Sequence, residues 1–211
     1  MTAEPSPSSA LDVDTLLFVL RERPGANKPG ESLALVDPFE VPLPGGGGTA
    51  AMAPAWFDLV GDLQLRLVRD TPEWVFTLHA SELADLKLGA DEALAIALAN
   101  FRRLHGPPRV SAWHNLRRVG GATEDVDHAW FLDRALWRGL LAGHPDGLVA
   151  ALPRTDLLVF APAADRAAVD SMRQGIPGLH AGGGDYRLSS ALYLFKDDRW
   201  SVFQPAAAAS A

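Results

Sequence analysis

The sequence predicts an α+β fold in which one or more largely antiparallel sheets, built from hairpins, pack against two or three helices. Three observations lead to this class. Most segments with strand-like composition follow one another across short turns, which is typical of antiparallel hairpins. Segments with helical periodicity are few and do not alternate with single strands, as they would in a parallel α/β protein. The chain also contains no internal repeat of fixed period.

The first part of the chain is the least regular. In residues 11–23, apolar residues follow two aspartates, a pattern that fits either an aspartate-capped helix or a strand. We favour the helix. Residues 32–36 are a short strand candidate. Residues 38–54 are rich in glycine and proline and are expected to form a loop. Its four consecutive glycines are not followed by a lysine, so they do not match a phosphate-binding loop.

A regular pattern begins after residue 62. Residues 63–68 alternate leucines with other side chains, and residues 73–78 are rich in aromatic and β-branched residues, so the two segments predict a hairpin. Residues 89–104 repeat apolar side chains at three and four residues. Acidic residues lie in the first turn of this segment and arginines in the last, as the helix dipole favours. We expect a helix there.

A second, more apolar helix is predicted from Glu124 to Ala142. On a helical wheel Trp130, Trp137 and Leu141 align in one strip on its flank. A helix with so little polar surface is buried on more than one side, either in its own core or against another chain. We take these three residues as candidate binding residues, with core packing as the alternative.

The last part of the chain predicts two hairpins around a helix. Residues 148–152 and 156–160 are consecutive strands, residues 163–174 a short helix and residues 175–185 a loop. Residues 191–196 and 199–203 form the final hairpin.

Both ends of the chain are of low complexity. We expect residues 1–10 and 205–211 to be disordered, which leaves residues 11–204 as a single domain. The N-terminus lacks the basic and apolar regions of a signal peptide, and no apolar run approaches the roughly 20 residues of a membrane span. Arginine outnumbers lysine 16 to 3 and alanine occurs 34 times, which is typical of a GC-rich bacterial genome. These features predict a cytoplasmic bacterial protein with no membrane partner.

Charge and cysteine content exclude further classes. Nineteen basic residues against 26 acidic residues give a net charge of −7, so there is no basic field for nucleic acid, and we expect no such partner. The absence of cysteine excludes disulfides, thiolate metal sites and a cysteine nucleophile.

No local motif for catalysis is present. The six histidines include no HExxH or similar zinc spacing, and the chain has no nucleophile elbow and no dinucleotide fingerprint. We therefore assign no catalytic residue, metal ligand or cofactor. The alternative is a metal-dependent hydrolase whose site is assembled from His114, Asp127 and His128 if the loop of residues 115–123 folds back.

Two segments carry a resemblance to a known family. Leu83–Leu104 contains an Ala-x-x-Asn-hydrophobic-Arg pattern (Ala97 to Arg102), and Gly147–Phe160 contains a Pro-x-x-Asp turn (Pro153 to Asp156). In these features the chain resembles, over residues 60–204, the DUF1444 (YtpQ-like) family of bacterial proteins of unknown function. The resemblance implies a helix, a hairpin, a second helix and a final hairpin, and it implies no activity.

The functional hypothesis follows from these exclusions. We expect a non-enzymatic protein-binding module that acts as an inhibitor, immunity or accessory protein for a basic partner, since its own charge is negative. A homodimer formed through the tryptophan-rich helix is the other possible assembly.

Overall fold

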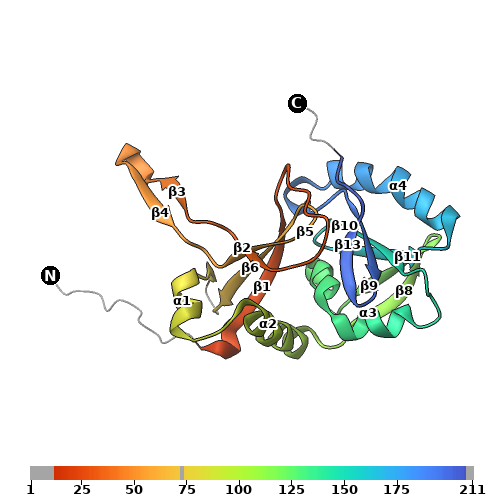
Figure 1. Cartoon of the computed structure of the whole chain (residues 1–211), viewed down its shortest axis with the longest axis horizontal. Coiled ribbons are helices and arrows are strands. Elements are labelled where there is room, and N and C mark those ends of the chain that lie inside the picture. Colours follow the sequence, from red (N-terminus) through yellow and green to blue (C-terminus); the bar gives the residue numbers. More distant parts are fainter. Residues whose placement is uncertain (1–11, 72–73, 208–211) are drawn as a thin grey trace.

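The computed structural model describes residues 12–71 and 74–207 of the 211-residue chain. Its strands form two larger antiparallel sheets and a separate two-stranded arm, and helices pack against the sheets (Figure 1). The predicted α+β class is confirmed. Within the described ranges, no helix is long and apolar enough to cross a membrane.

The first sheet has the strand order β1-β6-β5-β2, and β7 pairs with β6. Its strands are β1 (Leu16–Glu22), β2 (Ala34–Leu35), β5 (Trp56–Val60), β6 (Leu63–Asp70) and β7 (Val75–Thr77). The predicted hairpin over 63–78 is confirmed as β6 and β7, although residue 73, where its second strand was expected to begin, lies outside the described residues.

The helix favoured over residues 11–23 is wrong. A single 3-10 turn, η1 (Val13–Thr15), precedes β1, and residue 11 lies outside the described part. Leu16, Phe18 and Leu20 recur with the period of two that places them on one face of a strand, and all three are buried. Pairing with β6 satisfies the backbone of this segment.

The second sheet has the order β13-β12-β10-β11-β9-β8. Its strands are β8 (Arg109–Trp113), β9 (Leu116–Gly120), β10 (Leu148–Arg154), β11 (Leu157–Pro162), β12 (Leu192–Lys196) and β13 (Arg199–Gln204). The last four confirm the two predicted hairpins. The β8–β9 hairpin replaces a predicted loop. In its turn His114 has a φ of 53°, in the left-handed region. A histidine does not by itself predict such a turn, as glycine would.

Residues 39–52 form an arm that extends away from both sheets (Figure 1). In it β3 (Phe39–Pro42) pairs with β4 (Thr49–Met52) across the turn η2 (Pro44–Gly46). The irregular loop predicted over 38–54 is therefore a hairpin. Gly45, Gly46 and Gly48 have positive φ, which lets the chain reverse where other residues would be strained.

The α-helices of the described chain are α1 (Ala80–Asp85), α2 (Ala90–His105), α3 (Arg134–Leu141) and α4 (Arg166–Ala181), and 3-10 segments are η3 (Glu124–Leu132) and η4 (Gly184–Tyr186). The helix predicted over 89–104 is confirmed as α2. It packs on β1, where the rings of Phe101 and Phe18 lie 5.8 Å apart.

The single helix predicted over 124–142 is wrong, because the chain breaks at Asp133. Its carboxylate accepts the N–H of Leu136 at 3.0 Å and so begins α3, while η3 ends at Leu132. Arg102 of α2 binds the same carboxylate, with its Nε 2.9 Å from Oδ2. Asp133 is thus a helix cap and an ion-pair partner at once.

The last helix, α4, is longer than predicted. Asp165 caps it by accepting the N–H of Ala168 at 3.0 Å, and it continues through Pro177 to Ala181, where we expected a loop. Met172 and Ile176 are buried, so packing against the second sheet holds the helix beyond residue 174.

The main core is shared by both sheets, and a second cluster lies between the second sheet and α4. Alternate residues of β10 enter the two clusters, because successive side chains of a strand point to opposite faces. At the C-terminus, part of the predicted disordered tail is placed: Ala207 donates its N–H to Ser190 Oγ at 2.9 Å. The rest of that tail and residues 1–11 lie outside the described residues.

Candidate functional site

Trp130 and Trp137 lie in the core and are fully buried. The indole N–H of Trp137 donates to the Trp130 carbonyl at 2.9 Å, and its ring packs edge-on against Trp200 at 4.9 Å. Leu141 is partly buried against the same cluster. The binding strip predicted from these three residues is therefore wrong, and the alternative of core packing is what the structure shows. The break at Asp133 removes the continuous helix face on which the strip depended.

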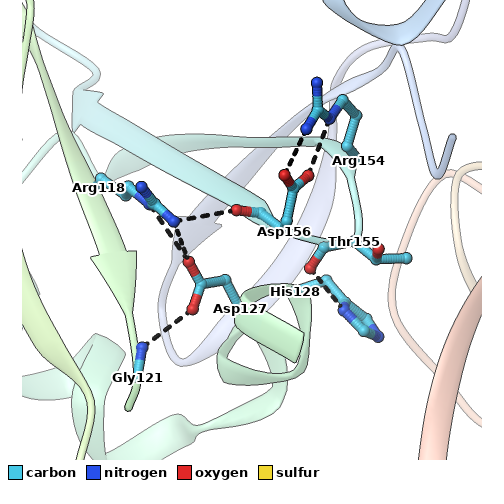
Figure 2. Close-up of polar contacts among 7 residues, drawn as sticks. All are labelled: Arg118, Gly121, Asp127, His128, Arg154, Thr155 and Asp156. Carbon is cyan, nitrogen blue, oxygen red and sulfur yellow. Dashed lines mark hydrogen bonds and ion pairs between the residues drawn. The ribbon is translucent and has the colours of Figure 1, made fainter. Parts of the chain in front are cut away.

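Asp127 is buried and engaged by an arginine and a backbone amide (Figure 2). Arg118 donates to Asp127 Oδ2 from Nη2 at 2.8 Å and from Nε at 3.2 Å. The N–H of Gly121 donates to Oδ1 at 2.9 Å. Arg118 also donates to the Asp156 carbonyl, so this cluster connects η3 to β9 and to the β10–β11 turn. These contacts give the Asp127 carboxylate a structural role.

His128 is buried beside the β10–β11 turn. Its backbone N–H lies 3.0 Å and its Nδ1 2.8 Å from the same carbonyl, that of Thr155 (Figure 2). A carbonyl only accepts, which assigns the ring hydrogen to Nδ1. Burial lowers the pKa of the imidazole from 6.5 to about 4, so His128 is neutral at pH 7. Nε2 is buried and makes no hydrogen bond within the described part of the chain.

His114 lies apart from the other two, exposed in the β8–β9 turn, with its ring against Trp113. Among residues 12–71 and 74–207 no group of three or more His, Cys, Asp or Glu side chains is placed to hold a metal ion. The structure therefore does not bring His114, Asp127 and His128 together as ligands.

A buried polar cluster joins the two sheets. Asp62, in the β5–β6 turn, accepts hydrogen bonds on Oδ1 from Ser189 Oγ and from the Tyr193 hydroxyl, both at 2.6 Å. The three side chains are almost fully buried. Gly61 allows the close approach, because a Cβ at this position would lie 2.8 Å from the Tyr193 ring. Ser189 is out of reach of a substrate in this structure, so the cluster fastens the sheets together.

The environment of this cluster raises the pKa of Asp62. Burial raises the pKa of the Asp62 carboxyl above its ordinary value, and nearby Glu22 acts in the same direction, against the hydrogen bonds from Ser189 and Tyr193. Glu22 in turn lies 3.3 Å from Nε2 of His180, at the end of α4. Sequence reasoning missed this junction, because its members come from distant parts of the chain.

The strand β7 and the residue before it carry the most exposed run of apolar side chains in the described chain. Trp74, Val75 and Phe76 are consecutive and retain 70%, 62% and 44% of their accessible surface. Among the described residues β7 pairs only with β6, so its outer edge is open. Beside the strand lies a hollow of about 310 Å³, whose walls include Asp70, Thr71 and the exposed Leu104 of α2. This end of the first sheet is a candidate protein-binding surface.

A larger groove of about 550 Å³ lies between α2 and the β12–β13 turn. Two of its charged walls are already paired, since Arg134 binds Glu31 and Asp198 binds Arg138. The other charged residues of the lining, Asp91 and Arg199, have opposite signs, so the groove has no strong excess of either charge. We assign it no role.

The sequence predicted a strand over 73–78, but not that this strand is exposed and has an open edge. The signal was present: Trp-Val-Phe does not alternate with polar residues, as a strand with one solvated face would. Whether such a run is buried or exposed depends on whether another strand lies beside it, which local sequence does not specify.

The fold and the exposed strand define an α+β protein that has an open, apolar sheet edge. Comparisons with protein-family models, with curated proteins and with solved structures found no match to this chain. The DUF1444 resemblance thus stays a prediction.

Proposed function

We propose that this protein is a non-enzymatic protein-binding module of a bacterial cytoplasm that binds its partner through β7. The observation that carries the proposal is the exposed run Trp74-Val75-Phe76, of which Trp74 directly precedes β7 and the other two lie on this strand with its open edge. β7 is short, only three residues, but its open edge carries apolar side chains, and natural proteins usually cover or charge such edges. Fully covering an apolar side chain stabilises a complex by roughly 1.5–3 kcal/mol. A partner seated here would gain several such contributions.

The charge distribution favours a basic partner. The segment from Asp70 to Glu92 contains six acidic residues and one lysine, a net charge of −5 within a chain of −7. We call it the acidic segment; it includes β7, α1 and the start of α2. Positive potential on the partner would speed its association and suppress wrong pairings. An inhibitor, immunity or accessory protein for a basic protein fits this description.

The same charges disfavour a homodimer through β7. Two copies joined at this edge would bring two acidic segments near each other, and like charges across an interface oppose association. We therefore favour a different protein as the partner over a second copy.

The test compares matched surface variants in the native host. Trp74→Asp removes the largest exposed apolar side chain, and Tyr186→Asp changes another exposed one, 56% accessible, in the segment η4 outside the first sheet. Tagged wild type is expected to capture one basic protein in stoichiometric amount. Trp74→Asp should reduce that capture at least tenfold while Tyr186→Asp retains it. Equal capture by all three proteins, or no partner for the wild type, would contradict the proposal.

A further inference from the structure

The register between β6 and β7 decides which backbone groups face the open edge. In an antiparallel pair, residues alternate between those that bond to the neighbouring strand and those that face away. The Trp74 carbonyl accepts the Thr71 N–H at 3.0 Å, and the Leu78 N–H donates to the Leu67 carbonyl at 3.1 Å. Trp74 and Phe76 therefore direct their backbone groups to the β6 side, and Leu78 directs its N–H there, while its carbonyl accepts the Ala55 N–H at 2.7 Å. The N–H and C=O groups of Val75 and Thr77 point outward, where no strand of the described chain lies.

The two outer edges of the second sheet are protected. The outer edge of β13 is covered by the chain around residue 30: Glu31 donates to the Trp200 carbonyl at 3.0 Å and Val202 to the Pro29 carbonyl at 2.9 Å. The edge strand β8 carries an exposed arginine, Arg109, and its large apolar side chains are half-buried. Charged side chains of this kind discourage edge pairing. In β7, by contrast, both the backbone groups and the apolar side chains are available.

Side chains on both faces of β7 are also accessible. Successive residues of a strand point to opposite faces, so Trp74 and Phe76 share one face and Val75 and Thr77 share the other. All four are exposed. An added strand would place its own alternating side chains beside these two pairs. The acidic segment is negative as a whole and includes Asp70, which pairs with Val75, whereas the guanidinium of Arg69 lies 5.4 Å from the Phe76 ring.

We propose that β7 binds an extended segment of the partner as an added strand, and that apolar side chains alternate in this segment with lysine or arginine. The proposal rests on the proposed function and names the partner's chemistry at the same surface. The outward N–H and C=O groups of Val75 and Thr77 supply up to four hydrogen bonds. Trp74 and Phe76 cover the apolar side chains of the segment, and its basic side chains lie near the acidic segment. Main-chain bonds of this kind provide affinity, while the alternating side chains provide specificity.

The test uses two synthetic nonapeptides, one alternating valine with lysine and one alternating valine with glutamate. Their binding to the full chain is followed by fluorescence anisotropy. The lysine peptide should bind at least tenfold more tightly than the glutamate peptide. Equal affinity, or no binding of the lysine peptide, would overturn the proposal.

Proline variants separate strand pairing from side-chain contact. Val75→Pro and Thr77→Pro each remove an outward N–H that β6 does not use, so the fold should persist; circular dichroism checks this. Both should weaken the lysine peptide at least tenfold. Phe76→Pro removes an inward N–H and serves as the control that disturbs the β6 ladder. Unchanged affinity in the folded Val75→Pro and Thr77→Pro variants would overturn strand addition.

The same variants distinguish failure of this inference from failure of the proposed function. If the partner captured from the host is lost with Trp74→Asp but retained with Val75→Pro and Thr77→Pro, the binding surface stands and strand addition is wrong. If Trp74→Asp also retains the partner, the proposed binding surface itself is wrong.

Discussion

Acidification tests the environment of His128 quantitatively. The folded protein holds this imidazole neutral with a pKa of about 4, against 6.5 for the unfolded chain. Between these values the unfolded state binds more protons, so the free energy of unfolding falls as the pH falls from 6.5 to 4. Each pH unit of separation is worth about 1.4 kcal/mol, and the whole interval contributes about 3 kcal/mol. Small domains have only about 5–15 kcal/mol in total.

The variant His128→Asn isolates this contribution. Asparagine keeps an N–H donor for the Thr155 carbonyl but does not titrate, and the carboxylates that also respond to acid are unchanged. Smaller packing adds a constant offset at all pH values. Urea unfolding of both proteins at pH 4, 5, 6 and 7 gives the difference in free energy. The advantage of the wild type over the variant should shrink by about 3 kcal/mol between pH 7 and pH 4. A difference that does not change with pH would refute the reasoning.

Substitutions at three further residues test the core and the junction between the sheets. Asp62→Asn keeps the Oδ1 acceptor and removes a carboxyl whose raised pKa makes the wild type lose stability as the pH rises above about 3.8. In urea unfolding at pH 7, Asp62→Asn should be at least as stable as the wild type. Asp62→Ala should be about 1–3 kcal/mol less stable than the wild type, because two buried hydroxyls lose their acceptor. A more stable Asp62→Ala than Asp62→Asn would contradict this account. Gly61→Ala should lower stability by about 1–3 kcal/mol, since its Cβ meets the Tyr193 ring, and an unchanged melting temperature would speak against that contact. Trp137→Asp should leave no folded protein by near-ultraviolet circular dichroism, whereas a folded variant would return this residue to the surface.

Much of the fold was predictable because its signals are local. The period of α2 and the two hairpins of the last sixty residues follow from side-chain spacing alone. The errors arose where distant contacts decide. β1 begins with five consecutive apolar residues and becomes a strand because β6 lies beside it. The helix expected over 124–142 is broken at Asp133, which caps α3 and binds the distant Arg102.

The candidate site was less predictable than the fold. Trp130 and Trp137 were predicted as binding residues, but both are core residues. The exposed tryptophan is Trp74. Exposure depends on where the sheet ends, and the sheet ends at β7 because no other described strand pairs with its outer edge. The junction at Asp62 could not be predicted either, because it also depends on contacts between distant segments. Ser189 lies 127 residues from its partner Asp62 in sequence.

Amide hydrogen exchange at Val75 and Thr77 tests the central claim most directly. Both amides point outward and should exchange rapidly in the protein alone. In the complex with the protein captured from the native host, both should exchange at least tenfold more slowly, while the inward amide of Phe76 changes less. Unchanged exchange at Val75 and Thr77, with new protection elsewhere on the chain, would contradict the claim that β7 is the binding surface.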